Sequence, residues 1–198
     1  AAAEFDEQAH RLAVQGNPMA LCHFHSYRAL AACLFNDDAA LIRHAAAAAG
    51  LTSHITGFYL TALINLLHSL ALIQQIRAMS AVQRPLLLEQ LAANQNWLAA
   101  RARDAPMNFR HLYDWVEAER LDVLDQPWDA LQWFQQAMRQ AQAHQRPWHH
   151  ALVTERAGQC YLRHGLEHAG RALLAQAHKL YRQWGADGKA RAMRSDLP

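Results

Sequence analysis

The feature that most constrains this chain is a spacing of residues that recurs in separate segments. Small and large residues follow one another at steps of three, four, five, four and three positions, in two segments that begin forty residues apart. A third segment with the same steps begins 89 residues before the earlier of these two. Self-similarity at a fixed period predicts a repeat architecture in which each unit packs on its neighbours. The three sets are Ala118, Leu121, Asp125, Ala130, Phe134 and Ala137; Gly158, Tyr161, Gly165, Gly170, Leu174 and Ala177; and Ala29, Ala32, Asn36, Leu41, Ala45 and Ala48.

These steps fit a helix, a turn and a second helix. A small residue and a larger one three positions later lie on one face of a helix. The third residue of each set (Asn36, Asp125 or Gly165) is expected to lie in the turn where the chain reverses. A small residue early in the second helix allows the two backbones to approach, and a large one a turn later fills the gap to the next pair. The spacing therefore predicts stacked, antiparallel helix pairs.

Prolines and glycines divide the chain into segments of helical length. A proline costs little in the first turn of a helix, so prolines at segment starts predict where helices begin. Asp125 and Ser53 are candidate N-cap residues. Val and Ile are sparse, which argues against sheets. The five prolines in question are Pro18, Pro85, Pro106, Pro127 and Pro147. The predicted helices cover residues 4–14, 18–35, 38–49, 53–77, 84–103, 108–124, 127–144, 147–164, 166–184 and 187–194.

We therefore predict an all-α chain that forms one repeat domain over residues 1–198. Its architecture is expected to be an antiparallel helix-pair solenoid, a tetratricopeptide-like superhelix, with about four pairs and a terminal helix. Alanine and leucine patterns also recur by chance in unrelated helical bundles. We favour a repeat over such a bundle because separate segments share identical steps. The expected pairs are 18–50, 53–104, 107–145 and 147–185, followed by a C-terminal cap at 186–198.

The spacing resembles that of the tetratricopeptide repeat, with three departures. Asp125 stands where that family prefers glycine, Gly170 stands in place of alanine, and Leu174 stands in place of an aromatic residue. The forty-residue period is also longer than the usual 34 residues of the family. The helices or loops are therefore expected to be longer than in the type repeat.

The C-terminal half carries several distinctive strings at residues 106–111, 118–119, 130–137 and 161–165, and the most specific is 181–189 (Tyr-Arg-Gln-Trp-Gly-Ala-Asp-Gly-Lys). With these strings it resembles a more specific family, the helical-repeat region of large bacterial multidomain signalling proteins. In that family a kinase-like domain and an ATPase domain precede the repeats, and a GAF domain and a histidine kinase or another output domain follow them. The resemblance implies a protein-interaction or effector-sensing segment in signal transduction, with the chemistry elsewhere in the parent. A chain that does not begin with Met agrees with a piece of a longer protein.

Signatures of catalysis and of cofactor binding are absent from the sequence. It holds no phosphate-binding glycine loop, no dinucleotide fingerprint and no nucleophile elbow, so neither an enzyme nor a cofactor is predicted. Thirteen histidines invite a metal site, but none of their spacings brings ligands to one side of a helix. Three cysteines without framework spacing fit buried free thiols in a reducing compartment, and hence the cytoplasm. A net charge of +2 argues against nucleic acid as a partner. The longest apolar run, at 58–73, is interrupted by polar residues, which argues against a membrane.

Candidate binding residues come from the first helix of each pair, which lines the concave side of such a solenoid. A protein or peptide, a neighbouring domain of the parent chain or a small effector is the expected partner. Another part of the parent protein could instead fill the groove. Two alternatives stay open: the sensor segment of an ATP-dependent transcription activator, and an all-helical metal-binding protein. Helical phase gives six groove candidates: Trp115, Glu119, Asp122, Glu155, Gln159 and Arg163.

Overall fold

The computed structural model describes residues 6–193, and helices account for most of them. No β-strand occurs in this range. The chain divides into two compact units at Gln74, within one long helix. The predicted helix start at residue 4 and the predicted cap beyond residue 193 lie outside the described residues. The prediction of an all-helical chain is confirmed, and the prediction of a single repeat domain stays a prediction.

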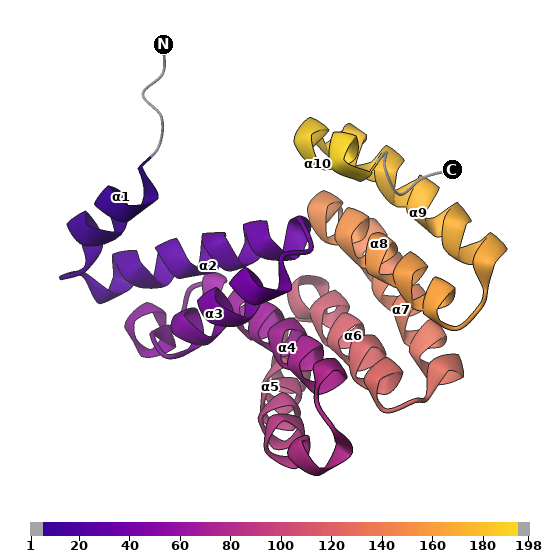
Figure 1. Cartoon of the computed structure of the whole chain (residues 1–198), viewed down its shortest axis with the longest axis horizontal. Coiled ribbons are helices and arrows are strands. Elements are labelled where there is room, and N and C mark those ends of the chain that lie inside the picture. The colour runs from indigo at the N-terminus through magenta and orange to yellow at the C-terminus, as the bar shows by residue number, and fades with distance from the viewer. Residues whose placement is uncertain (1–5, 194–198) are drawn as a thin grey trace. The chain divides into compact units, whose positions relative to one another are not determined.

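The unit up to Gln74 holds the first helices, of which α2 and α3 pack as a pair (Figure 1). Asp6, Asn17 and Asp37 cap α1, α2 and α3 by accepting a hydrogen bond from a backbone N–H three residues on. The elements of this unit are α1 (Glu7–Val14), α2 (Pro18–Leu34), α3 (Asp38–Ala49), the 3-10 turn η1 (Thr52–Ile55) and most of α4 (Leu60–Ala78).

The unit from Gln75 onward holds a longer run of helices in which sequence neighbours pack together: α5 on α6, α6 on α7, α7 on α8 and α8 on α9 (Figure 1). All four prolines predicted to start helices in this unit do so, at the first turns of α5 to α8. Its elements are η2 (Ala81–Gln83), α5 (Pro85–Asp104), α6 (Pro106–Val123), α7 (Pro127–Ala143), α8 (Pro147–Arg163), α9 (Glu167–Trp184) and α10 (Asp187–Ala192).

The start of α4 differs from the prediction. The sequence predicted one helix from residue 53, whereas the structure places η1 at Thr52–Ile55 and begins α4 at Leu60. Gly57 between them has φ +89°, a left-handed conformation that no α-helix continues through. The prediction of Ser53 as the N-cap of this helix is therefore wrong, because Ser53 lies inside the 3-10 turn.

One turn geometry recurs at five helix ends. A residue with positive φ follows the helix, and the next backbone N–H reaches back 2.9 Å to a carbonyl five residues earlier, as from Gln126 to Leu121. This is the hydrogen bond of the Schellman motif, which satisfies carbonyls at a helix end. Asp125 occupies the left-handed position at φ +59°, so it is a turn residue, and the N-cap of α7 is Gln126 rather than Asp125. The five left-handed residues are Asn36, Asp125, Gln145, Gly165 and Gly185.

The recurring small and large residues form the contacts between helices. Ala118 of α6, Ala130 and Phe134 of α7 are inaccessible to solvent. At the corresponding places of α8 and α9, Gly158 and Gly170 face each other, and a Cβ at Gly170 would lie 3.0 Å from the carbonyl oxygen of Gly158. The repeat spacing therefore marks the positions where neighbouring helices approach most closely.

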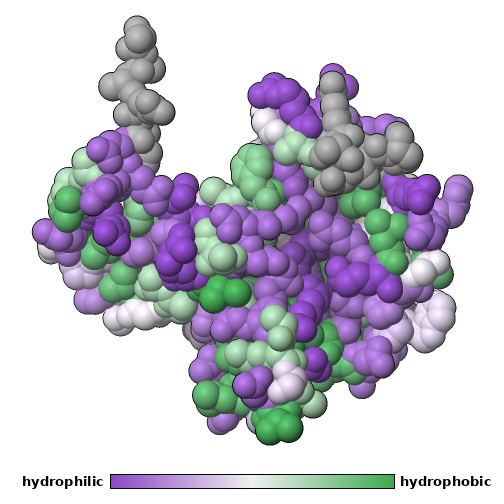
Figure 2. All heavy atoms as spheres, in the orientation of Figure 1, coloured by the Kyte–Doolittle hydropathy of each residue, from purple (hydrophilic) through white to green (hydrophobic). Residues whose placement is uncertain are grey.

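Hydrophilic residues cover much of the face shown in Figure 2, with hydrophobic ones scattered among them. The most apolar helix, α4, is buried around most of its circumference, from Leu63 to Ile76. Among the described helices, none combines the length and the apolar character needed to cross a bilayer.

Candidate functional site

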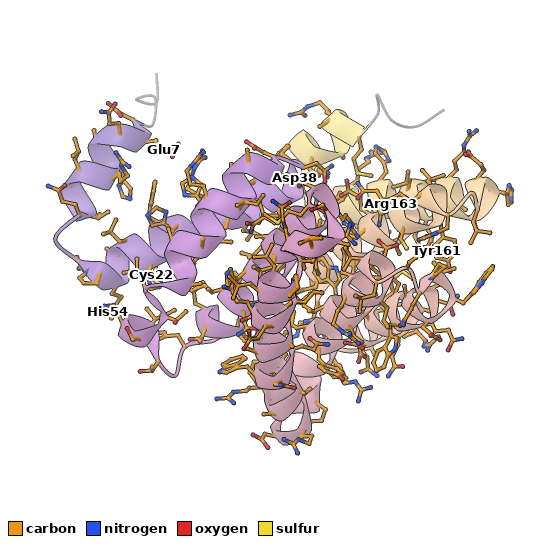
Figure 3. The ribbon with its side chains drawn as sticks, turned by 60° about the horizontal axis from the view of Figure 1, so that its bottom comes forward. Glu7, Cys22, Asp38, His54, Tyr161 and Arg163 are labelled. Atoms are coloured by element: carbon orange, nitrogen blue, oxygen red, sulfur yellow. The ribbon has the colours of Figure 1, made fainter. Side chains whose placement is uncertain are left out.

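The six predicted binding residues lie on α6 and α8, but most of them are covered by protein. Gln159 is half-buried. Arg163, near the C-terminal end of α8, keeps 40% of its side chain exposed and points to a different side of the helix from Tyr161 (Figure 3). The structure thus places charged groups in the interior, and the role of these residues in binding stays a prediction. The four buried members are Trp115, Glu119, Asp122 and Glu155.

Glu119 of α6 is fully buried and pairs with two arginines from other helices. Arg156 of α8 donates from Nε to Oε1 and, over 3.0 Å, from Nη2 to Oε2. Arg77, near the end of α4, donates to Oε2 over 3.0 Å, and Trp115 Nε1 lies 3.4 Å from Oε1. Burial by itself would raise the pKa of Glu119, but the guanidinium groups of Arg156 and Arg77 outweigh it and lower this pKa to about 2. Glu119 is therefore an ionised carboxylate that links three helices.

Asp122, one turn further along α6, accepts from four groups. Arg77 and Arg163 donate to Oδ2 over 2.5 and 2.6 Å. His164 Nε2 lies 2.7 Å from Oδ1, and Cys160 Sγ lies 3.3 Å from the same oxygen. Burial acts to raise the pKa of Asp122, but the hydrogen bond from His164 and the charges of Arg163 and Arg77 hold it well below its usual range. A carboxylate has about four acceptor positions, so this one is saturated.

Asp122, Cys160 and His164 also have the residue types of a metal site. Their ligand atoms lie within 4.8 Å of one another, and carboxylate, thiolate and imidazole are all zinc ligands. Two guanidinium groups already share the carboxylate, however. Burial and the neighbouring Asp122 raise the pKa of the Cys160 thiol to about 12, so a metal would have to displace a tightly held proton. The local charge thus favours a hydrogen-bonded ion network over a cation at this place.

Glu155 of α8 forms a second buried ion pair, with the terminal helix. Lys189 of α10 donates to Oε1 over 2.7 Å, and the Tyr181 hydroxyl of α9 donates to Oε2 over 2.8 Å. The Lys189 ammonium also lies 5.5 Å from the centre of the Tyr181 ring, within cation–π range. Both charged side chains are at most 5% exposed. This contact fastens α10 to α8 by charge.

The two networks together join helices that are not consecutive in the sequence. Glu119 and Asp122 connect the end of α4 to α6 and α8, and Glu155 connects α8 to α10. Pairing of this kind does not add large net stability, but removing one member leaves an uncompensated buried charge. Loss of either charged partner would therefore destabilise the contact between the helices that it joins.

Sequence reasoning identified the acids and missed most of their partners. Arg156 and Cys160 of α8 and His164 at its C-cap meet the acids of α6, and each lies one position beyond a predicted residue. Of the predicted set on α8, Arg163 also pairs with Asp122, whereas Glu155 pairs with Lys189 of α10. A signal was present, because Glu155 and Arg156 follow the apolar Ala151–Val153 and Thr154 and precede the small Ala157 and Gly158. Charged residues within such a segment are seldom buried unless paired. The partners missed were Arg77, Arg156, Cys160, His164, Tyr181 and Lys189.

Comparisons with protein-family models, with curated proteins and with solved structures give no match. The resemblance to the repeat region of bacterial signalling proteins therefore stays a prediction.

Proposed function

We propose that this chain is a non-catalytic binding segment of a multidomain bacterial signal-transduction protein, built as a tetratricopeptide-like solenoid and located in the cytoplasm. Its partner is an acidic segment of another protein or of a neighbouring domain of the parent chain. The proposal is supported by the paired helices, by the turn that recurs at five helix ends and by the buried repeat residues. All three cysteines are buried and none forms a disulfide, which agrees with a reducing compartment.

The observation that carries the acidic partner is the charge of the network around Asp122. Glu119 and Asp122 supply two carboxylates, against three guanidinium groups from Arg77, Arg156 and Arg163. The carboxylates are at most 3% exposed, whereas the side chains of Arg77 and Arg163 are 23% and 40% exposed. The accessible edge of the network is therefore cationic. Arginine N–H groups at this edge can pair with a carboxylate of a partner.

The test is binding of a fluorescein-labelled peptide of eight residues rich in glutamate, followed by fluorescence anisotropy at low salt. A matched peptide with glutamine in place of glutamate measures the contribution of charge. We expect the acidic peptide to bind more tightly, and Arg163→Gln to weaken it about five-fold, which corresponds to about 1 kcal/mol for a partly exposed ion pair.

Arg171→Gln is the matched control, because Arg171 is also an exposed arginine and pairs with Glu167 on α9. It removes the same charge from a different place and should leave peptide affinity unchanged. Equal binding of the two peptides, or equal losses in the two variants, would show that the network edge is not a binding site. The alternative role in a transcription activator makes the same binding prediction, and a DNA-binding domain in the parent would decide for it.

A further inference from the structure

A cavity of about 400 Å³ lies between the end of α7, the start of α8 and the end of α9, away from the two ion networks. Its size falls within the range of small-molecule sites. Three glutamine amides, one guanidinium, one imidazole and one indole surround it, together with aliphatic side chains. The lining residues are Ala141, Gln142, Gln145, Arg146, Pro147, His150, Leu180, Gln183 and Trp184.

Two of the polar side chains in this cavity are incompletely satisfied by the protein. His150 is 8% exposed, and within the described residues its ring has no hydrogen-bond partner. Arg146 donates from Nη2 to Asn108 Oδ1 over 2.6 Å, but its Nε is buried and has no acceptor in the described part of the chain. Buried polar groups are normally paired, so the unpaired Arg146 Nε is an exception beside this cavity.

The charge around the cavity is of one sign. Of the described residues that line it, none is acidic, and Arg146 supplies a full positive charge. The first N–H groups of α8 have no intrahelical acceptor, and no side chain caps them. The positive end of the helix dipole therefore adds to the charge of Arg146. Burial lowers the pKa of His150, so its ring is neutral at pH 7 and offers one donor.

The rest of the cavity lining includes apolar side chains and one aromatic side chain. Trp184 presents its indole with 38% of the residue exposed, and Leu180, Pro147 and Ala141 complete the surface. A flat apolar group is the complement of such a surface. We propose that this cavity binds a small organic anion, a carboxylate or phosphate joined to a flat apolar body, with its charged end at Arg146 and His150.

This site is independent of the proposed peptide site. Arg146 precedes α8 and Arg163 ends it, and a helix of 17 residues separates its ends by about 25 Å. Loss of one site therefore leaves the other in place, and each proposal can fail without the other.

The experiment is isothermal titration of the full chain with 1-naphthoate and with 1-naphthyl phosphate. Neutral 1-naphthamide tests the need for charge, and inorganic phosphate tests the need for the apolar body. We expect at least one naphthyl anion to bind, with the naphthamide and inorganic phosphate at least ten-fold weaker. The tighter of the two anions identifies the headgroup.

Variants then locate the binding. Arg146→Gln should raise the dissociation constant at least ten-fold and Arg146→Lys should retain part of the affinity, whereas Arg171→Gln should have no effect. Trp184→Leu, in the apolar lining, gives a second reading if Arg146→Gln fails to fold, and it should weaken the naphthyl ligands. Equal affinity for the naphthamide, unchanged affinity in both Arg146→Gln and Trp184→Leu, or no binding at millimolar concentrations would overturn the proposal.

Discussion

The contact between α8 and α9 gives a prediction whose size follows from distances. A Cβ on Gly170 would lie 2.8 Å from Cγ and Cδ2 of Leu162 and 3.0 Å from the carbonyl oxygen of Gly158. The leucine side chain can rotate away, but the carbonyl belongs to the backbone of α8. The methyl group of Gly170→Ala therefore forces the two helices apart.

The magnitude is a difference between two effects. Overpacking in a tight contact costs about 1–3 kcal/mol, and replacing glycine by alanine inside a helix gains about 1 kcal/mol. We expect a net loss of about 1 kcal/mol for Gly170→Ala. For a chain of this size, each kcal/mol corresponds to a change in melting temperature of about 2–4 °C.

Gly188→Ala is the matched control. Gly188 is also helical, in α10, and a Cβ built there meets nothing within 4 Å. This variant should therefore be stabilised, by about 0.5–1 kcal/mol. Urea unfolding monitored by circular dichroism at 222 nm measures both. If Gly170→Ala is as stable as Gly188→Ala, the close approach of α8 and α9 is refuted. Gly158→Ala should lower the stability less in the Gly170→Ala background than in the wild-type chain. The reason is that the methyl group at Gly170 has already separated the same two backbones.

Three further predictions concern the buried charge, the turns and the thiols. Glu119→Gln should cost about 3–5 kcal/mol at pH 7, because it breaks a buried pairing. The folded pKa of Glu119, about 2, is below the unfolded value. The stability that Glu119 contributes is therefore fully present above about pH 4.3 and is lost as pH falls towards 2. In urea unfolding at several pH values, the free energy of unfolding should fall less steeply with acid in the variant than in the wild type, and identical pH dependences would contradict this. Gly165→Ala should lower the stability by about 1 kcal/mol, because Gly165 has φ +75°, whereas Asp125→Gly, at φ +59°, should not lower it. Equal losses of stability in thermal melts would argue against the left-handed turns. Cys160 should not react with a disulfide reagent at pH 8 until the protein unfolds, because its thiol is buried with a pKa of about 12; rapid reaction of the native protein would show that the thiol is accessible.

The secondary structure follows from local physics. A proline in the first turn, present in α6, α7 and α8, and a left-handed residue after the last turn act within a few residues. The bounds of α6 to α9 therefore agree with the sequence to about two residues. The failure at α4 has the same origin, since the apolar pattern continues through Ile55 to Leu60 while Gly57 breaks the helix. Gln145 was not foreseen in a left-handed turn, because glutamine has no marked preference for that conformation.

The candidate sites show where sequence reasoning reaches its limit. Helical phase gave Glu119, Asp122 and Glu155 as groove candidates, and the structure buries all three side chains. It could not show that Arg77, 42 residues before Glu119, would meet that carboxylate, because the distance depends on how α4 and α6 are placed in space. The cavity at Arg146 was not foreseen either, since its lining comes from three helices that the sequence keeps up to 43 residues apart.

The sequence by itself determined that this chain is helical, where most of its helices begin and end, and which small residues allow close packing. These properties depend on interactions between residues a few positions apart. Only the tertiary structure decided that the carboxylates of α6 and α8 would be buried in ion pairs, that Asp122 would be saturated by four donors, and that Arg146 and His150 would border a cavity. Such contacts depend on the crossing and register of whole helices, which the summed packing of many side chains sets and which no single segment encodes.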